Sequence, residues 1–377
     1  MIYFDHAATT QVCPAAVEAA VRAMTEAFGN PSSTYPLGKE AARERDGRRA
    51  VIAKALGCLP EELFFTSCGT EGDNWAVRAA VEYGKKKGKH IVTTAIEHDA
   101  ILQPMKALEG EGFEVTYLKP DRFGNIDPQA VREAVRPDTI LVSMMLVNNE
   151  VGSILPVRSA HEAIVEAGAP ALLHCDAVQG FLKVPFTPAE LGADLVTICG
   201  HKVRAPKGIG GLYIRKELIG KLNPLLRGGG QEGGMRPGTE PTAQIAAFAA
   251  AVESWGAGSS DRIRSVRDYA AKALGAIDGV EIITDINTAA PHILAISLPA
   301  FSGQTVVEAL GGQGVCVSSG SACHRGKPSY VFAAMPLPPK VRLGAVRVSF
   351  GPESTTEEVD ELVRLIRHIC ENKTLLF

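Results

Sequence analysis

The chain has 377 residues, of which 46% are hydrophobic and 21% are charged, and its formal net charge is −3. This composition is ordinary for a soluble globular protein, and the length favours two domains over one. The small net charge gives no indication of a nucleic-acid partner. No apolar stretch is long enough to span a membrane, and the N-terminus lacks the basic and apolar regions of a signal peptide. We therefore expect a cytoplasmic protein with no membrane partner.

The cysteines of the chain show no pattern typical of metal or redox sites. The eight cysteines lie at positions 13, 58, 68, 175, 199, 316, 323 and 370, and they form no C-x-x-C pair and no zinc-type spacing. In a cytosolic protein they should be reduced, and most should be small core residues. We predict no metal site.

The first two-thirds of the chain alternate between helical and strand-like segments. A short extended piece, 3–10, precedes a helix from Pro14 to about Phe28, in which Val17, Val21 and Met24 recur at helical spacing. A charged helix follows at about 38–56. Strands are then expected at 63–66, 90–95, 114–118, 139–147, 171–176 and 194–198, with helices starting near 71, 99, 128 and 157. This alternation predicts a doubly wound α/β fold with a mainly parallel sheet and crossover helices.

The pattern changes after a helical run at 245–252, where Gly256-Ala-Gly-Ser-Ser260 has the composition of a domain joint. Beyond it, helices are expected at 261–274, 305–310 and 356–370, and strands at 280–284, 293–298, 315–318 and 347–350. We predict a large α/β domain of residues 15–254. A smaller α+β domain should combine residues 1–14 with residues 255–377.

Two strand ends carry side chains with a shared chemical use. The strand at 194–198 ends just before Gly200, so Lys202 lies where the chain leaves the sheet, and the strand at 171–176 ends in Asp176. Open α/β sheets bind ligands beyond the carboxyl ends of their strands. A lysine that forms a Schiff base and an aspartate that keeps a pyridine nitrogen protonated are two groups that a pyridoxal phosphate (PLP) site needs. The segment 66–74 adds small residues and a helix start, which favours a phosphate.

Eleven short motifs follow one another along the chain. They are Phe4-Asp-His-Ala-Ala-Thr-Thr10, Gly29-Asn-Pro-Ser-Ser33, Phe65-Thr-Ser-Cys-Gly-Thr-Glu-Gly-Asp-Asn74, Glu97-His98, Asn148-Asn-Glu-Val-Gly152, Asp176-Ala-Val-Gln179, Gly200-His-Lys202, Arg227-Gly-Gly-Gly-Gln-Glu232, Arg236-Pro-Gly-Thr-Glu240, Ser318-Ser-Gly-Ser-Ala-Cys323 and Val346-Arg-Val-Ser349. In this order they resemble the motifs of the cysteine desulfurases, which belong to the class V aminotransferase superfamily of fold-type-I PLP enzymes. The resemblance extends from Tyr3 to the last helix.

This resemblance implies a role for each matching residue. Lys202 would hold PLP covalently and carry protons, Asp176 would pair with the pyridine nitrogen, and His98 would stack on the ring and take part in proton transfer. The other implied cofactor ligands are Asn149 and Gln179 at the phenolic oxygen, and Gly69, Thr70, His201 and, from the other subunit of a homodimer, Thr239 at the phosphate. Arg347, helped by Asn30, would bind the carboxylate of the substrate, L-cysteine.

Cys323 would be the nucleophile in this family. It would take the sulfur of L-cysteine as a persulfide, release L-alanine and deliver the sulfur to an acceptor protein. The neighbouring His324 and Arg325 would lower the pKa of its thiol. The acceptor stays open between an iron–sulfur cluster assembly scaffold, a tRNA-thiolation protein, another cofactor pathway and a selenium protein.

The chain departs from the family pattern at four places. Cys68 replaces a usual glycine, Tyr35 a frequent histidine, and Cys199 a serine that commonly donates to the phosphate, a loss of about 1 kcal/mol. The segment 323–329 is shorter than in the housekeeping iron–sulfur branch, which reduces the reach of Cys323. Three alternatives remain: a selenocysteine lyase supplying selenium, an aminotransferase of the same fold, and a PLP-bound partner protein with little turnover.

Overall fold

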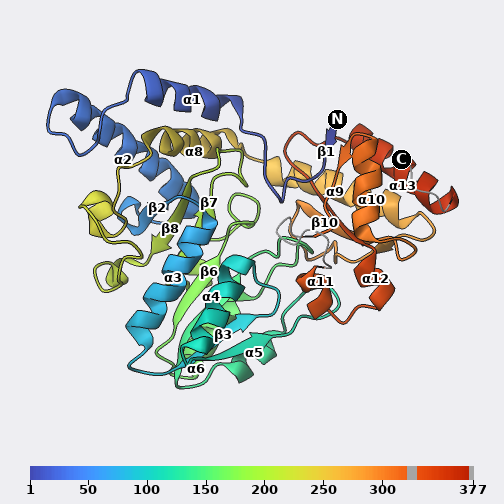
Figure 1. Ribbon diagram of the computed structural model, residues 1–377, viewed down its shortest axis with the longest axis horizontal. Coiled ribbons are helices and arrows are strands. Elements are labelled where there is room, and N and C mark those ends of the chain that lie inside the picture. Colours follow the sequence, from blue (N-terminus) through green and yellow to red (C-terminus); the bar gives the residue numbers. More distant parts are fainter. Residues whose placement is uncertain (321–328, 373–377) are drawn as a thin grey trace.

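The computed structural model describes residues 1–320 and 329–372, and its centre is a seven-stranded sheet with the order β2-β8-β7-β6-β5-β3-β4 (Figure 1). The strands are β2 (Leu63–Thr66), β3 (His90–Thr94), β4 (Glu114–Leu118), β5 (Thr139–Met145), β6 (Leu172–Asp176), β7 (Leu195–Cys199) and β8 (Gly210–Ile214). β8 is antiparallel to both of its neighbours, and the other adjacent pairs are parallel. The predicted mainly parallel α/β sheet is confirmed. β8 is a strand that the sequence analysis missed.

Both faces of this sheet are buried, because successive residues of a strand point to opposite sides. Leu172 and Leu195 pack with side chains of α3 (Gly69–Gly84) and α4 (Asp99–Gly110) in one apolar cluster. Their chain neighbours Leu173 and Val196 belong to a second cluster on the other side. Because both faces are covered, apolar residues have to follow one another along these strands instead of alternating with polar ones.

The remaining helices of the first two-thirds of the chain are α1 (Pro14–Thr25), α2 (Pro36–Leu56), α5 (Pro128–Ala134), α6 (Val157–Glu166), α7 (Pro188–Leu191) and α8 (Thr242–Ser254), with three short 3-10 segments at 60–62, 216–218 and 231–234. α1 and α2 pack on α8, to the upper left in Figure 1. α1 buries its small residues Ala16 and Ala23, whereas Val17, Val21 and Met24 are exposed. The predicted helix is confirmed, but its large apolar side chains face outward in the single chain.

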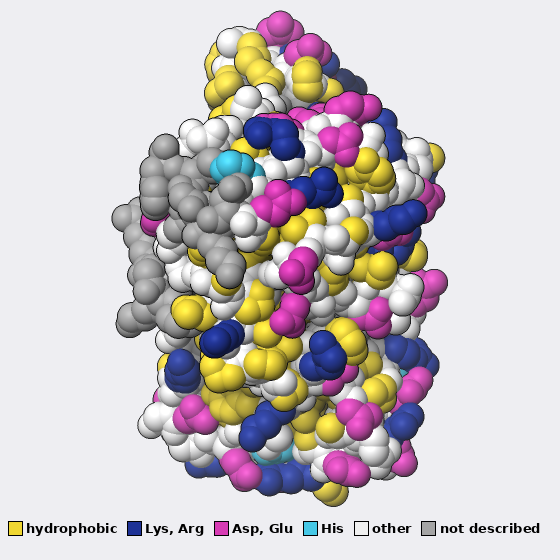
Figure 2. Space-filling model, turned by 90° about the vertical axis from the view of Figure 1, so that its right-hand side faces the viewer, with side chains coloured by type: hydrophobic (Ala, Val, Ile, Leu, Met, Phe, Trp, Pro, Cys, Tyr) yellow, Lys and Arg dark blue, Asp and Glu magenta, His cyan; other side chains and the backbone are white. Residues whose placement is uncertain are grey.

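A second group of elements lies beside the large sheet. Strands β12 (Ala345–Ser349), β10 (Ile293–Ser297) and β9 (Glu281–Ile282) form an antiparallel sheet, and β1 (Ile2–Tyr3) pairs in parallel with β11 (Val315–Cys316). The helices here are α9 (Ser259–Gly275), α10 (Gly303–Gly312), α11 (Tyr330–Ala334), α12 (Pro339–Leu343) and α13 (Thr356–Asn372). The chain start and α13 lie together at this end (Figure 1). Its outer face intermingles acidic, basic and apolar side chains (Figure 2).

The segment after β1 connects these two parts of the fold. Phe4 is fully buried, its ring lies 5.3 Å from that of Phe350, and its carbonyl accepts from Ser349 N at 2.7 Å. Six residues later, Thr10 N donates to the carbonyl of His201 at 2.9 Å. The backbone in between therefore passes directly over the chain that follows β7. Within residues 1–320 and 329–372, no helix combines the length and apolar character that a bilayer span needs.

Candidate active site

A cavity of about 260 Å³ opens at the carboxyl ends of the parallel strands. Its lining comes from segments far apart in the sequence: Ala7, Ala8, Cys68, Gly69, Thr70, Asp73, His98, Met145, Val147, Asn149, Asp176, Val178, Gln179, Cys199, His201, Lys202 and Arg347. Parallel strands bring their carboxyl ends to one edge, which is why residues following β2, β3, β5, β6 and β7 meet here. The segment after β1 and the strand β12 close the cavity from the other side.

Lys202 brings an amine into this cavity. Its Nζ donates to the carbonyl oxygens of Ala7 and Ala8, both at 2.6 Å. Burial, helped by the nearby Arg347, lowers the pKa of Lys202 to about 8, against the raising effects of Cys199, Asp5 and Asp176. At neutral pH roughly a tenth of such amines are unprotonated, far more than for a free lysine. Part of Lys202 is therefore present as the neutral amine, the form that reacts with a carbonyl group.

Asp176 ends β6 and is 5% exposed. Burial raises the pKa of its carboxyl, against the opposing effects of the Val178 N–H, which donates to Oδ1 at 2.9 Å, and of His98 and Lys202. A second buried carboxyl, that of Asp73, interacts electrostatically with Asp176. Burial and the charge of Asp176 raise the pKa of Asp73 well above its usual value. A cationic partner in the cavity would stabilise the charged form of Asp176, as a protonated pyridine nitrogen does.

His98 is the N-cap of α4, and its Nδ1 accepts from Ala100 N at 3.1 Å. A neutral His98 ring consequently carries its proton on Nε2. The preceding residue, Glu97, is fully buried and accepts from Thr94 Oγ1 at 2.8 Å and from Met145 N at 3.0 Å. Burial raises the pKa of Glu97 to about 8. These contacts hold the turn between β3 and α4 so that His98 borders the cavity.

The start of α3 forms the opposite wall. Gly69 is its first residue, and the extended Cys68 is its N-cap, without a side-chain capping bond. A Cβ at Gly69 would lie 2.9 Å from Val178 Cγ2, so glycine allows a close approach of the helix terminus to the turn after β6. The free N–H groups of such a terminus attract an anion. Burial raises the pKa of Cys199 to about 11, so the thiol beside this terminus stays neutral.

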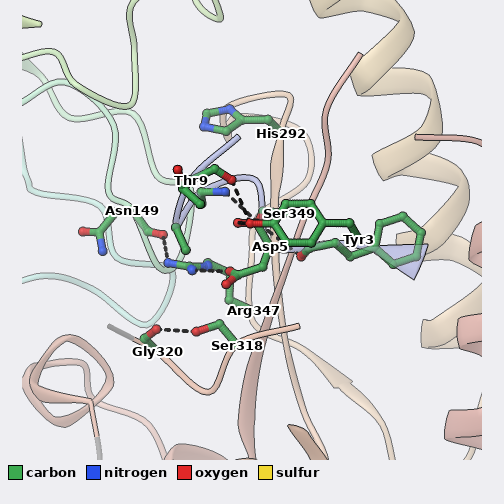
Figure 3. A network of polar contacts seen from close by, with 12 residues as sticks. Tyr3, Asp5, Thr9, Asn149, His292, Ser318, Gly320, Arg347 and Ser349 are labelled. Atoms are coloured by element: carbon green, nitrogen blue, oxygen red, sulfur yellow. Dashed lines mark hydrogen bonds and ion pairs between the residues drawn. The ribbon is translucent and has the colours of Figure 1, made fainter. Parts of the chain in front are cut away.

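Arg347 extends from β12 and is 2% exposed (Figure 3). Its Nη1 donates to the carbonyl of Asn149 at 2.9 Å, and its Nη2 donates to Asp5 Oδ1 at 2.6 Å. Nε of Arg347 and Oδ1 of Asn149 are buried without a hydrogen-bond partner among the described residues. A buried guanidinium with an unused donor suits a second carboxylate.

The structure brings most of the sequence-predicted site residues to this one cavity. These are Gly69, Thr70, His98, Asn149, Asp176, Gln179, His201, Lys202 and Arg347. Asn30 and Thr239 are exposed and do not line the cavity of the single chain. Cys323 lies outside the described residues. The individual roles of all these residues stay predictions.

Some residues that line the cavity or bind its side chains were not singled out from the sequence. Asp5 and the carbonyls of Ala7 and Ala8 bind Arg347 and Lys202, and Asp73 lies beside Asp176. The motifs Phe4–Thr10 and Phe65–Asn74 were the available signals, since they indicated functional segments without showing which atoms contact the site.

The residues present fit PLP. The cavity combines a lysine of lowered pKa, a buried carboxylate that a cation would stabilise, and a helix terminus that a Cβ at Gly69 would obstruct. These groups match the aldehyde, the pyridine nitrogen and the phosphate of the cofactor.

The comparisons with known proteins agree with this chemistry. Residues 2–362 match the family model of the class-V aminotransferases. Cysteine desulfurase IscS of Methanosarcina thermophila is 38% identical over 375 residues, which cover 98% of this chain and 92% of the relative. A solved NifS-like protein has a TM-score of 0.92 at 36% identity, with 98% of this chain and 99% of that chain covered. SspA in complex with cysteine has a TM-score of 0.81 at 32% identity, with 94% and 100% covered.

The chain therefore belongs to the aminotransferase class-V family. Its fold is that of the fold-type-I PLP enzymes, as predicted. Within the family, the similarity is to cysteine desulfurases and NifS-like proteins.

Proposed function

We propose that the protein is a PLP-dependent cysteine desulfurase, which converts L-cysteine to L-alanine and passes the sulfur to an acceptor. The observation that carries this proposal is the meeting of Lys202, Asp176 and Arg347 in one cavity. It combines a covalent attachment point for the cofactor, a partner for the cofactor's ring and a site for an amino-acid carboxylate.

Four residues would hold the cofactor and substrate. Bound PLP supplies a sink for the electron pair released when the substrate loses its Cα proton. Lys202 would anchor the cofactor, and its lowered pKa suits its amine to take up and return a proton at the substrate Cα. The Asp176 carboxylate would stabilise the positive charge of the protonated ring nitrogen. His98, which lines the cavity, would take part in proton transfer beside the cofactor, and Arg347 would bind the substrate carboxylate with its remaining donor capacity.

Cys323 would accept the sulfur. Its thiolate attacks the sulfur of the substrate, a sulfur–sulfur bond forms, and the carbon–sulfur bond breaks. The electron pair of the broken bond stays with the carbon skeleton, which takes up a proton and leaves as alanine. The assignment of Cys323 is supported by the motif Ser318-Ser-Gly-Ser-Ala-Cys323.

We further propose a cytoplasmic homodimer that delivers its sulfur to an acceptor protein. The dimer is supported by the exposed apolar side chains Val17, Val21 and Met24 on α1, and by the exposed positions of Asn30 and Thr239. The partner subunit would bring its Thr239 to the cavity. Sedimentation velocity tests the dimer.

The division into a large domain of residues 15–254 and a small domain of residues 1–14 and 255–377 also stays a proposal. The pairing of β1 with β11 and the bridge between Asp5 and Ser349 support grouping the N-terminal segment with the C-terminal part.

The attachment of the cofactor has a direct test. The protein is incubated with PLP, reduced with borohydride and digested, and the peptides are identified by mass spectrometry. The proposal predicts one reduced PLP adduct, on Lys202, which Lys202→Ala abolishes. A stable adduct on another lysine, with none on Lys202, would contradict the assignment.

A further inference from the structure

His292 comes from the C-terminal part of the fold yet reaches the active-site wall. It directly precedes β10 (Figure 3) and is completely buried, and its backbone carbonyl accepts from Phe350 N at 2.9 Å. Its Nε2 lies 3.1 Å from Oε1 of Gln179, a residue that lines the cavity. Its Nδ1 has no hydrogen-bond partner among the described residues. Among the described residues, Gln179 is therefore the hydrogen-bond partner of the His292 imidazole.

The orientation of the Gln179 amide follows from its other partner. Gln179 Nε2 donates to the carbonyl of Ala7 at 2.9 Å, and a carbonyl can only accept. The amide oxygen must then face His292, so the Nε2 of His292 carries the proton. The opposite tautomer would place two lone pairs 3.1 Å apart and leave a buried N–H unpaired.

The charge state of the ring agrees with a permanent donor. Burial holds the pKa of His292 well below its ordinary value, and the nearby Lys183, Arg347, His6 and Arg267 lower it further. The ring stays neutral at physiological pH, with one N–H.

The same carbonyl serves the catalytic lysine. Ala7 O accepts from Gln179 Nε2 and from Lys202 Nζ, at 2.9 and 2.6 Å. Its two lone pairs are thus both used. A continuous set of hydrogen bonds therefore connects His292 through Gln179 and the Ala7 carbonyl to Lys202. His292 and Gln179 are 113 positions apart in the sequence.

We propose that His292 is a positioning residue that fixes the Gln179 amide with its nitrogen directed away from β10, so that the second amide N–H is available to the phenolic oxygen of PLP. This inference rests on the proposed function and assigns to His292 a role that no motif indicated. Without the imidazole donor, the Gln179 amide can rotate and present its oxygen to the cofactor. An oxygen there would repel the phenolic oxygen.

The test compares PLP-loaded variants by the pH dependence of their visible absorbance and by PLP affinity. His292→Leu removes the donor and should weaken PLP binding about 2- to 10-fold, the usual effect of one hydrogen bond, and shift the midpoint of the absorbance titration. His292→Gln carries an N–H at a similar distance along its side chain and should restore both. His90→Leu is the matched control. His90 is an equally buried histidine, bonded to Thr139 and Thr116, and it does not line the cavity.

A double-mutant cycle identifies the route. If His292 acts through Gln179, His292→Leu should change neither readout when Gln179→Leu is already present. The inference is overturned if His292→Leu lowers the melting temperature as His90→Leu does, but its titration midpoint and PLP affinity equal those of the native protein. Additive effects in the cycle would equally overturn it. Native protein that forms no alanine from cysteine would refute the proposed function instead, because both PLP readouts are independent of turnover.

Discussion

Arg347 donates through Nη2 to the carboxylate of Asp5 at 2.6 Å, across 342 positions of sequence. The pair gives a guanidinium that is 2% exposed a counter-ion from the N-terminal segment. Asn149 O occupies Nη1, and Nε stays without a partner among the described residues (Figure 3). Two hydrogen bonds thus fix Arg347, and the remaining Nε donor supports its proposed role in binding a substrate carboxylate.

Replacing Arg347 by lysine should therefore impair substrate binding more than cofactor binding. Arg347→Lys keeps the charge beside Asp5 but loses the planar fork, so KM for L-cysteine should rise about 10- to 100-fold, with a smaller change in kcat. Steady-state alanine formation measures both constants. Arg267→Lys is the control, because Arg267 is fully buried and bonded to the carbonyls of Ala289, Ala290 and Ile286, away from the cavity. An unchanged KM in Arg347→Lys would refute the carboxylate role.

Cys199 is the second position at which a substitution has a predicted direction. Its thiol is neutral and borders the cavity near the start of α3. Cys199→Ser supplies a stronger hydrogen-bond donor and should tighten PLP binding about 2- to 10-fold. Equilibrium titration of the cofactor-free protein measures this. Cys175→Ser, also buried but absent from the cavity wall, should give no gain. Equal effects of the two substitutions would contradict a specific contact at position 199.

Lys183 should make the free energy of unfolding depend on pH. It is 4% exposed, its Nζ has no hydrogen-bond partner among the described residues, and burial lowers its pKa to about 7. Because the unfolded chain binds the proton more tightly, this group makes stability rise with pH between about 7 and 10.5. Lys183→Met should raise the free energy of unfolding at pH 7 by roughly 2–4 kcal/mol and flatten that rise. Denaturant unfolding of the cofactor-free protein at several pH values tests it, and a destabilised variant would count against it.

Glu97 should show the opposite dependence on pH. Its pKa is raised from 4.5 to about 8, so the folded protein binds the proton more tightly, and stability falls as pH rises between those values. Glu97→Gln keeps the acceptor for Thr94 Oγ1 and Met145 N but cannot ionise. Relative to the native protein, the variant should gain on the order of 3 kcal/mol between pH 5 and pH 8. A parallel pH dependence of the two proteins would show that Glu97 is not neutral when folded.

The sequence alone was enough to predict which residues meet at the carboxyl edge of the large sheet. Parallel strands align their carboxyl ends, so residues following predicted strands, such as Lys202 and Asp176, had to meet in space. Contacts across the fold had no comparable rule. The pairing of Asp5 with Arg347 and the use of the Ala7 and Ala8 carbonyls depend on how the N-terminal segment crosses the cavity.

Strand β8 was missed for a physical reason. It begins with Gly210 and Gly211, and glycine ordinarily argues against a strand interior. A Cβ at Gly210 would lie 2.8 Å from Thr66 Oγ1 and 2.9 Å from the Ile198 carbonyl oxygen. The glycine is required because the strand is closely packed between β2 and β7, a constraint that local sequence does not reveal.

We propose that the protein removes sulfur from cysteine by way of Cys323. The most direct measurement follows alanine formation from L-cysteine and, in parallel, from L-selenocysteine, in the native protein and in Cys323→Ala, with mass spectrometry of the peptide containing residue 323. We predict alanine from cysteine together with a persulfide on Cys323, and loss of both in the variant. If cysteine yields no alanine while selenocysteine is converted with or without Cys323, the protein is a selenocysteine lyase and the claim is wrong.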